Sequence, residues 1–150
     1  MKQVAGTLRL DLASYREKQA FAQFGSDLDA TTQYQLNHGA HMMELLKQKR
    51  YSALPAADQV IAIFAAKENF IDDIDLDHVV LFRDELAKYM NEKHDALRRQ
   101  IVAGKIDDET EARLRTHIEH FKKKFLEEHP NRAALDVAEM SEQTDDPAKA

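Results

Sequence analysis

Apolar residues recur at intervals of three and four along nearly all of the first 126 residues, which is the period of an α-helix. The clearest example is the run Leu76, Val79, Phe82, Leu86 and Tyr89. Turn-forming residues are scarce, with 4 glycines and 3 prolines in 150 residues, so an all-β sandwich or barrel is excluded. The chain is therefore predicted to be all-α, a bundle of about five to six helices.

The few helix-breaking residues fall between the apolar runs and predict where helices begin and end. Gly25 and Gly104 follow such runs, at the place where a left-handed C-cap is wanted. Pro55 suits the first turn of a short and very apolar helix. Residues 108–111 (Asp-Glu-Thr-Glu) resemble a capping box, so their first Asp is expected to cap the last helix. Residues 69–77 form an acidic connector.

Helical spacing also predicts which side chains face the core. On the first helix, one apolar stripe is continued by two phenylalanines: Val4, Leu8, Leu12, Tyr15, Phe21 and Phe24. On the second helix, which Gly39 should weaken locally, the predicted face consists of Leu36, Ala40, Met43 and Leu46. Six residues are expected in the core: Leu8, Leu12, Phe64, Phe82, Leu86 and Phe121.

Charge divides the chain into a nearly neutral body and an acidic tail. Residues 127–150 contain seven acidic and two basic side chains (net −5), and residues 1–126 contain 20 acidic and 19 basic ones (net −1). The tail holds too little apolar surface to offset the entropy of ordering it. We therefore predict one helical domain over residues 1–126 and a disordered tail over residues 127–150.

Composition also excludes several classes of partner. The basic run at residues 122–124 fits a solvated helix face and is no footprint for nucleic acid. No stretch of about 18 apolar residues occurs, and the N-terminus lacks the apolar core of a signal peptide, so direct membrane insertion is not expected. The absence of cysteine excludes disulfides and thiolate zinc sites. We expect a cytoplasmic or peripheral protein.

Catalytic motifs are missing from this sequence. Its glycines, at positions 6, 25, 39 and 104, are too far apart for a P-loop or a dinucleotide-binding loop. None of its three serines stands in the G-x-S-x-G setting of a hydrolase. The chain alone is therefore predicted to have no catalytic residues, no bound cofactor and no ATPase activity.

Histidines at helical spacing supply candidate metal ligands. The patterns are His38-x-x-His41-x-x-Glu44, His117-x-x-His120 and Asp75-x-x-His78. Di-metal sites in helical bundles use Glu-x-x-His on two helices together with further inward carboxylates, and no Glu-x-x-His occurs here. Surface histidines are the simpler interpretation, so no metal site is predicted, and a metal-binding bundle stays an alternative.

Two long runs near the N-terminus resemble the α subunit of F-type ATP synthase. Residues 4–17 read V-A-G-T-L-R-L-D-L-A-S-Y-R-E, and residues 20–33 read A-F-A-Q-F-G-S-D-L-D-A-T-T-Q. The similarity continues through residues 44–48 (E-L-L-K-Q), Tyr51 and residues 59–60 (Q-V). Residues 1–126 thus resemble, from end to end, the C-terminal helical domain of that subunit.

The resemblance implies a setting for the chain. In the family, a nucleotide domain precedes this region. That domain carries a P-loop and an arginine that reaches the neighbouring catalytic site. Because this chain contains neither, we expect it to come from a truncated or partial reading frame. The α subunits alternate with β subunits in a hexamer around a rotating γ shaft, at the inner face of the plasma membrane or its matrix or stromal equivalent. Implied partners are the β and γ subunits and the remainder of the α subunit. The full-length subunit is implied to be noncatalytic and regulatory, with a part in ATP synthesis and in proton or sodium transport. It is also implied to bind ATP or ADP with Mg.

Two groups of site residues are implied by position. In the family, glutamines after the second helix line the adenine pocket of the noncatalytic site; Gln48 matches the first, and Arg50 stands in place of the second. An arginine can stack on a purine but offers no hydrogen-bond acceptor. The loop implied to face the γ shaft consists of Gly25, Ser26, Asp27, Leu28 and Asp29, and Ser26 or Asp27 is expected to cap the helix that follows.

The chain also departs from the family. Residues 65–71 replace a turn that usually bears glycine and tyrosine, which should lengthen or tighten the helix end without changing the fold. The acidic tail exceeds the usual family ending. A function of another class, a freestanding helical protein-interaction module without catalysis, therefore stays open beside the ATP synthase interpretation.

Overall fold

The computed structural model describes residues 5–24, 27–50, 52–104 and 106–132. Over these ranges the chain is all-α, with six α-helices, one 3₁₀ turn and no strand, so the predicted fold class is confirmed. The helices are α2 (Leu8–Ala22), α3 (Ala30–Leu45), α4 (Ala56–Lys67), α5 (Val79–Lys93), α6 (Asp95–Val102) and α7 (Asp108–Glu128), and the 3₁₀ turn η1 (Leu76–His78) precedes α5.

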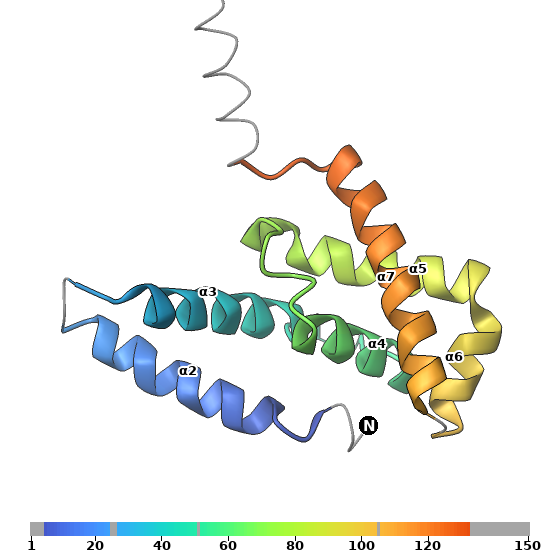
Figure 1. Cartoon of the computed structure of the whole chain (residues 1–150), viewed down its shortest axis with the longest axis horizontal. Helices are drawn as coiled ribbons and strands as arrows, with labels where there is room; N and C mark the ends of the chain where they lie inside the picture. Colours follow the sequence, from blue (N-terminus) through green and yellow to red (C-terminus); the bar gives the residue numbers. More distant parts are fainter. Residues whose placement is uncertain (1–4, 25–26, 51, 105, 133–150) are drawn as a thin grey trace, which may run out of the picture.

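Helix α4 lies at the centre of the bundle, where it packs against α3, α5, α6 and α7. Figure 1 shows α2 and α3 side by side as an outer pair, while α5, α6 and α7 gather at the other end of the molecule. The aromatic centre of the core is Phe82 of α5, whose ring lies 5.4 Å from that of Phe121 and 5.2 Å, edge-on, from that of Phe125. The outer pair is therefore attached to the core mainly through α3.

The core prediction holds in the interior and fails at the outer pair. Phe64, Phe82, Leu86 and Phe121 are buried as expected, whereas Leu8 and Leu12 are half-buried at the edge of the core. The extension of the α2 stripe was wrong, because Phe21 is 78% and Phe24 is 92% exposed. The physical reason is that α2 packs mainly on α3, and its last turn extends beyond the other helices (Figure 1).

The buried face of α3 differs from the predicted one. Gly39, His41, Met42 and Leu45 are buried, whereas Leu36, Ala40, Met43 and Leu46 are only half-buried. His41 can face inward because its two ring nitrogens each lie 2.7 Å from a carbonyl oxygen, those of Asn37 and Ile74. Gly39 is required by packing, since a Cβ there would overlap the Tyr15 ring of α2. The buried face of α3 is therefore set by the hydrogen bonds of His41 and by the close approach of α2 at Gly39. Apolar periodicity reflects neither of these.

The helix boundaries after residue 50 lie close to the predicted ones. Gly104 has φ 76° and ends α6, as expected. Pro55 immediately precedes α4. The cap of α7 is Asp107 and not Asp108, because Asp107 has the extended backbone of an N-cap and its carboxylate accepts a hydrogen bond from the Thr110 N–H at 2.8 Å. Hydrogen bonding from Thr110, first from its side chain and then from this backbone N–H, lowers the pKa of Asp107.

Asn69 supplies the left-handed conformation at the end of α4. Its φ is 61°, and the next N–H, that of Phe70, bonds to the carbonyl of Ala65 at 2.9 Å, which is the long hydrogen bond of a Schellman motif. Phe70 and Ile71 then enter the core as the connector begins. An asparagine thus performs the local role that glycine usually performs.

The domain continues past the predicted start of the tail. Residues 127 and 128, which were predicted to belong to the tail, form the end of helix α7. Asn131 and Arg132 make hydrogen bonds to the acidic connector. The Arg132 guanidinium pairs with the Asp77 carboxylate at 2.8 Å. This corrects the predicted disorder at its beginning. The remainder of the predicted tail, residues 133–150, lies outside the described residues.

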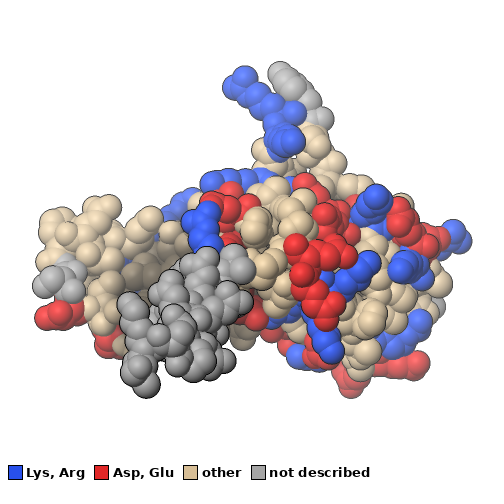
Figure 2. Space-filling model, turned by 90° about the horizontal axis from the view of Figure 1, so that it is seen from above, with Lys and Arg blue, Asp and Glu red and all other residues tan. Residues whose placement is uncertain are grey.

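The surface of the described residues carries charges of both signs. Figure 2 shows Lys and Arg interspersed with Asp and Glu over the face seen from above, while the end that holds the tip of the α2–α3 pair is mostly uncharged. Among the helices that the structure describes, none has both the length and the apolarity needed to cross a bilayer.

Candidate functional site

The loop between α2 and α3 forms the exposed tip of the outer pair. Asp27 and Asp29 are exposed and Leu28 is half-buried, while Gly25 and Ser26 lie outside the described residues. Asp29 occupies the N-cap position of α3, although its side chain makes no capping hydrogen bond. The expected cap at Ser26 or Asp27 was therefore wrong, because the helix begins later than the sequence indicated. Within the described residues, the Asp27 and Asp29 side chains make no hydrogen bond or ion pair.

The second implied site lies at the opposite end of α3. Gln48 and Arg50 are both exposed and follow the last residue of that helix. Since α3 has 16 residues, roughly 24 Å of helix separates them from the tip at Asp29. The structure thus keeps the two implied sites apart, and they can serve different partners.

Gln48 lines a hollow of about 480 Å³ between the end of α3 and α5. The other lining residues are Glu44, Lys47, Lys49, Ser52, Leu54, Val80, Arg83, Asp84 and Ala87. Arg50 is not among them, so the structure brings only one of the two implied adenine contacts to this hollow. Three basic and two acidic side chains line it, and because Lys47 pairs with Glu44 and Arg83 with Asp84, Lys49 is the one lining charge in excess.

Arg83, which sequence reasoning missed, forms the wall of this hollow. Its side chain is 7% exposed, and one terminal nitrogen donates to the carbonyl oxygens of Leu45 at 2.8 Å and Lys47 at 2.5 Å. The rest of the guanidinium binds the Asp84 carboxylate, at 2.9 Å and 2.7 Å. Helix C-termini leave carbonyls without intrahelical partners, and a buried cation there satisfies them and complements the helix dipole.

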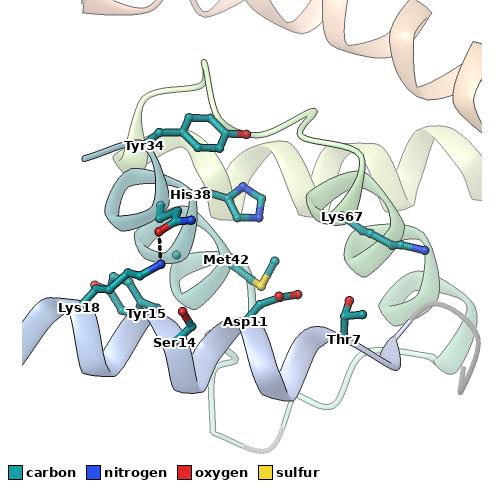
Figure 3. Close-up of a pocket in the computed structure, with 11 residues that line it drawn as sticks. Thr7, Asp11, Ser14, Tyr15, Lys18, Tyr34, His38, Met42 and Lys67 are labelled. Atoms are coloured by element: carbon teal, nitrogen blue, oxygen red, sulfur yellow. Dashed lines mark hydrogen bonds between the residues drawn. The ribbon is translucent and has the colours of Figure 1, made fainter. Parts of the chain in front are cut away.

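A second hollow, of about 360 Å³, lies between α2 and α3 and contains His38 (Figure 3). Asp11 lines it from α2 and Lys67 from the end of α4. The His38 ring nitrogen lies 2.6 Å from the Asp72 carboxylate, which also accepts from the Tyr34 hydroxyl at 2.9 Å. The hydrogen bond to Asp72 raises the pKa of His38 against the opposing effect of burial. These contacts join α3 to the acidic connector.

The candidate metal ligands on α3 already have other partners. His38 bonds to Asp72 and both ring nitrogens of His41 approach carbonyl oxygens. Glu44 pairs with Lys47 at 2.5 Å. A metal ion at this helix face would have to displace each of these contacts.

His117 belongs to a stacked histidine pair. Its ring lies 3.7 Å from that of His94, at 28° between the ring planes, and the Tyr89 hydroxyl lies 3.1 Å from the other histidine's Nε2. Burial lowers the pKa of both rings, and nearby positive charges, including Arg113, lower it further. The other member of the sequence pair, His120, is exposed.

One group of possible metal ligands has no sequence signature. Single atoms of Glu85, Glu128 and His129 lie within 4.8 Å of one another. Spacing could not reveal the group, because Glu85 comes from α5 and the other two from the end of α7. Glu128 also approaches Lys124 at 3.6 Å. Exposed carboxylates often gather in this way without a metal, and no further feature of the described residues indicates an ion.

Comparison with known proteins identifies the family. The family described as "ATP synthase alpha/beta chain, C terminal domain" matches residues 1–121. The ATP synthase subunit alpha of Aquifex aeolicus (strain VF5) is 44% identical over 127 residues, which cover 84% of this chain and 25% of that protein. The subunit alpha of Paenarthrobacter aurescens (strain TC1) is 44% identical over 131 residues, covering 87% of this chain and 24% of that protein.

These relatives are much longer than this chain. The chain spans about a quarter of their length, and the matched range takes in α2 through most of α7. The similarity includes the tip loop and the segment that carries Gln48. This chain therefore belongs to the family of C-terminal domains of ATP synthase alpha and beta chains, and its sequence is that of the C-terminal helical domain of an α subunit.

Proposed function

We propose that this chain serves as the C-terminal domain of the noncatalytic, regulatory α subunit of a proton- or sodium-translocating F-type ATP synthase. The observation that carries the proposal is the 44% identity to two α subunits over more than four fifths of the chain. In this role the domain packs beside β subunits, surrounds the rotating γ shaft and supports ATP synthesis. Its location is then peripheral, at the inner face of the coupling membrane.

The tip of the outer pair suits a contact with the shaft. Phe21 and Phe24 leave a large apolar surface uncovered, and Asp27 and Asp29 add exposed negative charge beside it. A monomeric domain rarely leaves phenylalanines this exposed unless another surface covers them. The stretch from Phe21 to Asp29 is therefore proposed as the γ-facing surface.

The other end of α3 suits the edge of a nucleotide pocket. Gln48 is exposed on the hollow between the end of α3 and α5, and its amide can donate to and accept from an adenine edge. Arg50 is exposed nearby in sequence and can stack on the base. ATP or ADP with Mg would be held chiefly by the rest of the full-length subunit, so this chain supplies only part of the pocket.

Assembly tests the proposal. The chain would replace the corresponding C-terminal domain of the Aquifex aeolicus α subunit, and the chimeric α subunit would be co-expressed with tagged γ and with β subunits. Recovery of α, β and γ together is expected, and the unaltered relative serves as the positive control. A chimera that stays helical by circular dichroism yet recovers neither β nor γ would favour a freestanding interaction module.

A further inference from the structure

We infer that Arg83 is a positioning residue for the nucleotide-facing segment, because it fixes the turn that carries Gln48. This inference rests on the proposed function, since it concerns how the adenine-facing edge is held in place. Arg83 comes from α5, whereas Gln48 follows α3, so the two residues belong to different parts of the chain. Both line the same hollow.

The contacts of Arg83 bracket the point where the chain leaves α3. Leu45 is the last residue of that helix, and Lys47 is the residue immediately before Gln48. Arg83 donates to the carbonyl oxygens of both, and so holds the exit turn of the helix against α5. The direction in which the chain presents Gln48 is set by these two hydrogen bonds.

The guanidinium is itself held rigidly. The Asp84 carboxylate accepts from the remaining guanidinium nitrogens, at 2.9 Å and 2.7 Å. The Arg83 side chain is almost fully buried. A planar guanidinium can make these bonds in fixed directions at once. A lysine at position 83 could reach one carbonyl but could not reproduce the set. Loss of the Arg83 guanidinium would remove the donor to the Leu45 and Lys47 carbonyl oxygens at the end of α3, at a cost in free energy because such buried acceptors need a partner.

Discrimination between adenine and guanine separates positioning from general stability. The experiment uses the full-length chimeric α subunit described above and measures the affinity for Mg-ATP and for Mg-GTP by titration calorimetry. Gln48→Ala should lower the preference for ATP about three- to tenfold, the factor carried by one amide hydrogen bond. Arg83→Met should lower the same preference by a similar factor, although it removes no contact to the base. Arg83→Lys should fall between Arg83→Met and the unsubstituted chimera.

The matched control is Arg98→Met. Arg98 lies on α6, is half-buried and pairs with Asp58 at 3.0 Å, so its loss also removes an internal ion pair. Arg98→Met should leave the preference for ATP unchanged. Equal losses in the two methionine variants would overturn the positioning role and show a structural one.

Gln48→Ala separates the two levels of the proposal. If Gln48→Ala lowers the preference and Arg83→Met does not, the positioning role is wrong while the nucleotide contact stands. If Gln48→Ala changes nothing, the nucleotide contact itself is wrong, and the role of Arg83 falls with it. If Arg83→Met fails to fold, Arg83→Lys gives the same comparison, and an unchanged preference there contradicts the positioning role.

Amide hydrogen exchange gives a second readout in the 150-residue chain itself. The peptide covering residues 46–50 should exchange faster in Arg83→Met than in the unsubstituted chain, because the exit turn is no longer bonded to α5. The same peptide should be unaffected in Arg98→Met. Unchanged exchange in Arg83→Met would show that the turn does not depend on this side chain.

Discussion

Helices α4 and α2 both carry large apolar side chains, α4 a higher proportion of them, and the two helices end in opposite environments. Nearly all of α4 from Ala57 to Ala66 is buried, whereas α2 contains no buried residue. Helix α4 has helices on several sides, and α2 packs mainly on α3. An apolar stripe therefore indicates that a helix needs a surface to pack against. The fold decides how much of that surface comes from other helices of the same chain.

The difference also separates two kinds of role. The region around α4 and α5 holds the domain together, because its aromatic and aliphatic side chains contact each other on all sides. The outer pair exposes apolar and acidic side chains at its tip, where they contribute little to the stability of the isolated chain.

The same substitution should have very different costs in the two regions. Phe82 is 0% exposed, so Phe82→Ala should lower the free energy of unfolding by about 3–5 kcal/mol, since it removes a fully packed ring and leaves a cavity. Phe24 is 92% exposed, so Phe24→Ala should change it by less than about 0.5 kcal/mol. Urea denaturation measures both. A loss below about 1 kcal/mol for Phe82→Ala would contradict the observed core.

The packing of α2 on α3, within the outer pair, depends on Gly39. A methyl group there would overlap the Tyr15 ring, so Gly39→Ala should cost roughly 1–3 kcal/mol, more than the gain of up to about 1 kcal/mol that alanine gives a helix interior. Amide exchange should accelerate in α2 and stay slow in α5. In a Tyr15→Ala background the penalty of Gly39→Ala should vanish; its persistence would show that another contact requires the glycine.

The two regions should respond to pH with opposite signs. Because the bond to Asp72 raises the folded pKa of His38 above its usual 6.5, its stabilisation is complete below pH 6.5 and is lost as the pH rises through the folded pKa. The folded pKa values of His94 and His117 are lowered by burial, so their contribution is complete above pH 6.5 and is lost as the pH falls through those values.

Single variants separate the two pH effects. Stability measured by urea titration between pH 5 and 8 should lose its decline at higher pH in His38→Gln. His117→Gln should reduce the decline at lower pH, because the stacked pair no longer has to accept two charges. Unchanged curves in both variants would show that other groups control the pH dependence.

The smallest effect on the chain alone is expected at the tip. Asp29 is exposed and makes no capping hydrogen bond, but it occupies the N-cap position of α3, so Asp29→Lys should lower the free energy of unfolding by about 1 kcal/mol at most, through the helix dipole. In the assembled chimera, the same reversal should alter γ affinity or coupled ATP synthesis, with the salt dependence of exposed charges. Unchanged synthesis, hydrolysis and γ binding at low salt would exclude Asp29 from the shaft contact.

The sites were only partly predictable from sequence. Gln48 and the tip loop were proposed through family resemblance, and the structure leaves Gln48, Asp27 and Asp29 exposed, with Gln48 at the opposite end of α3 from the other two. Arg83 was missed because its partners are backbone carbonyls far away in the sequence, which leave no pattern of residue types. The link between His38 and Asp72 was missed for a related reason, since the connector that carries Asp72 has no regular period.

Helical period and the scarcity of turn residues by themselves determined the fold class, the positions of Gly104 and Pro55 near helix ends, and the burial of Phe64, Phe82 and Leu86. These features depend on neighbours within one or two helical turns, which the sequence lists directly. Only the tertiary structure decided which face of α3 is buried, that Asp107 and not its neighbour caps α7, and that Phe21 and Phe24 stay outside. Those outcomes depend on where other helices lie and on which carbonyls need donors, and such contacts join residues whose separation along the chain carries no period.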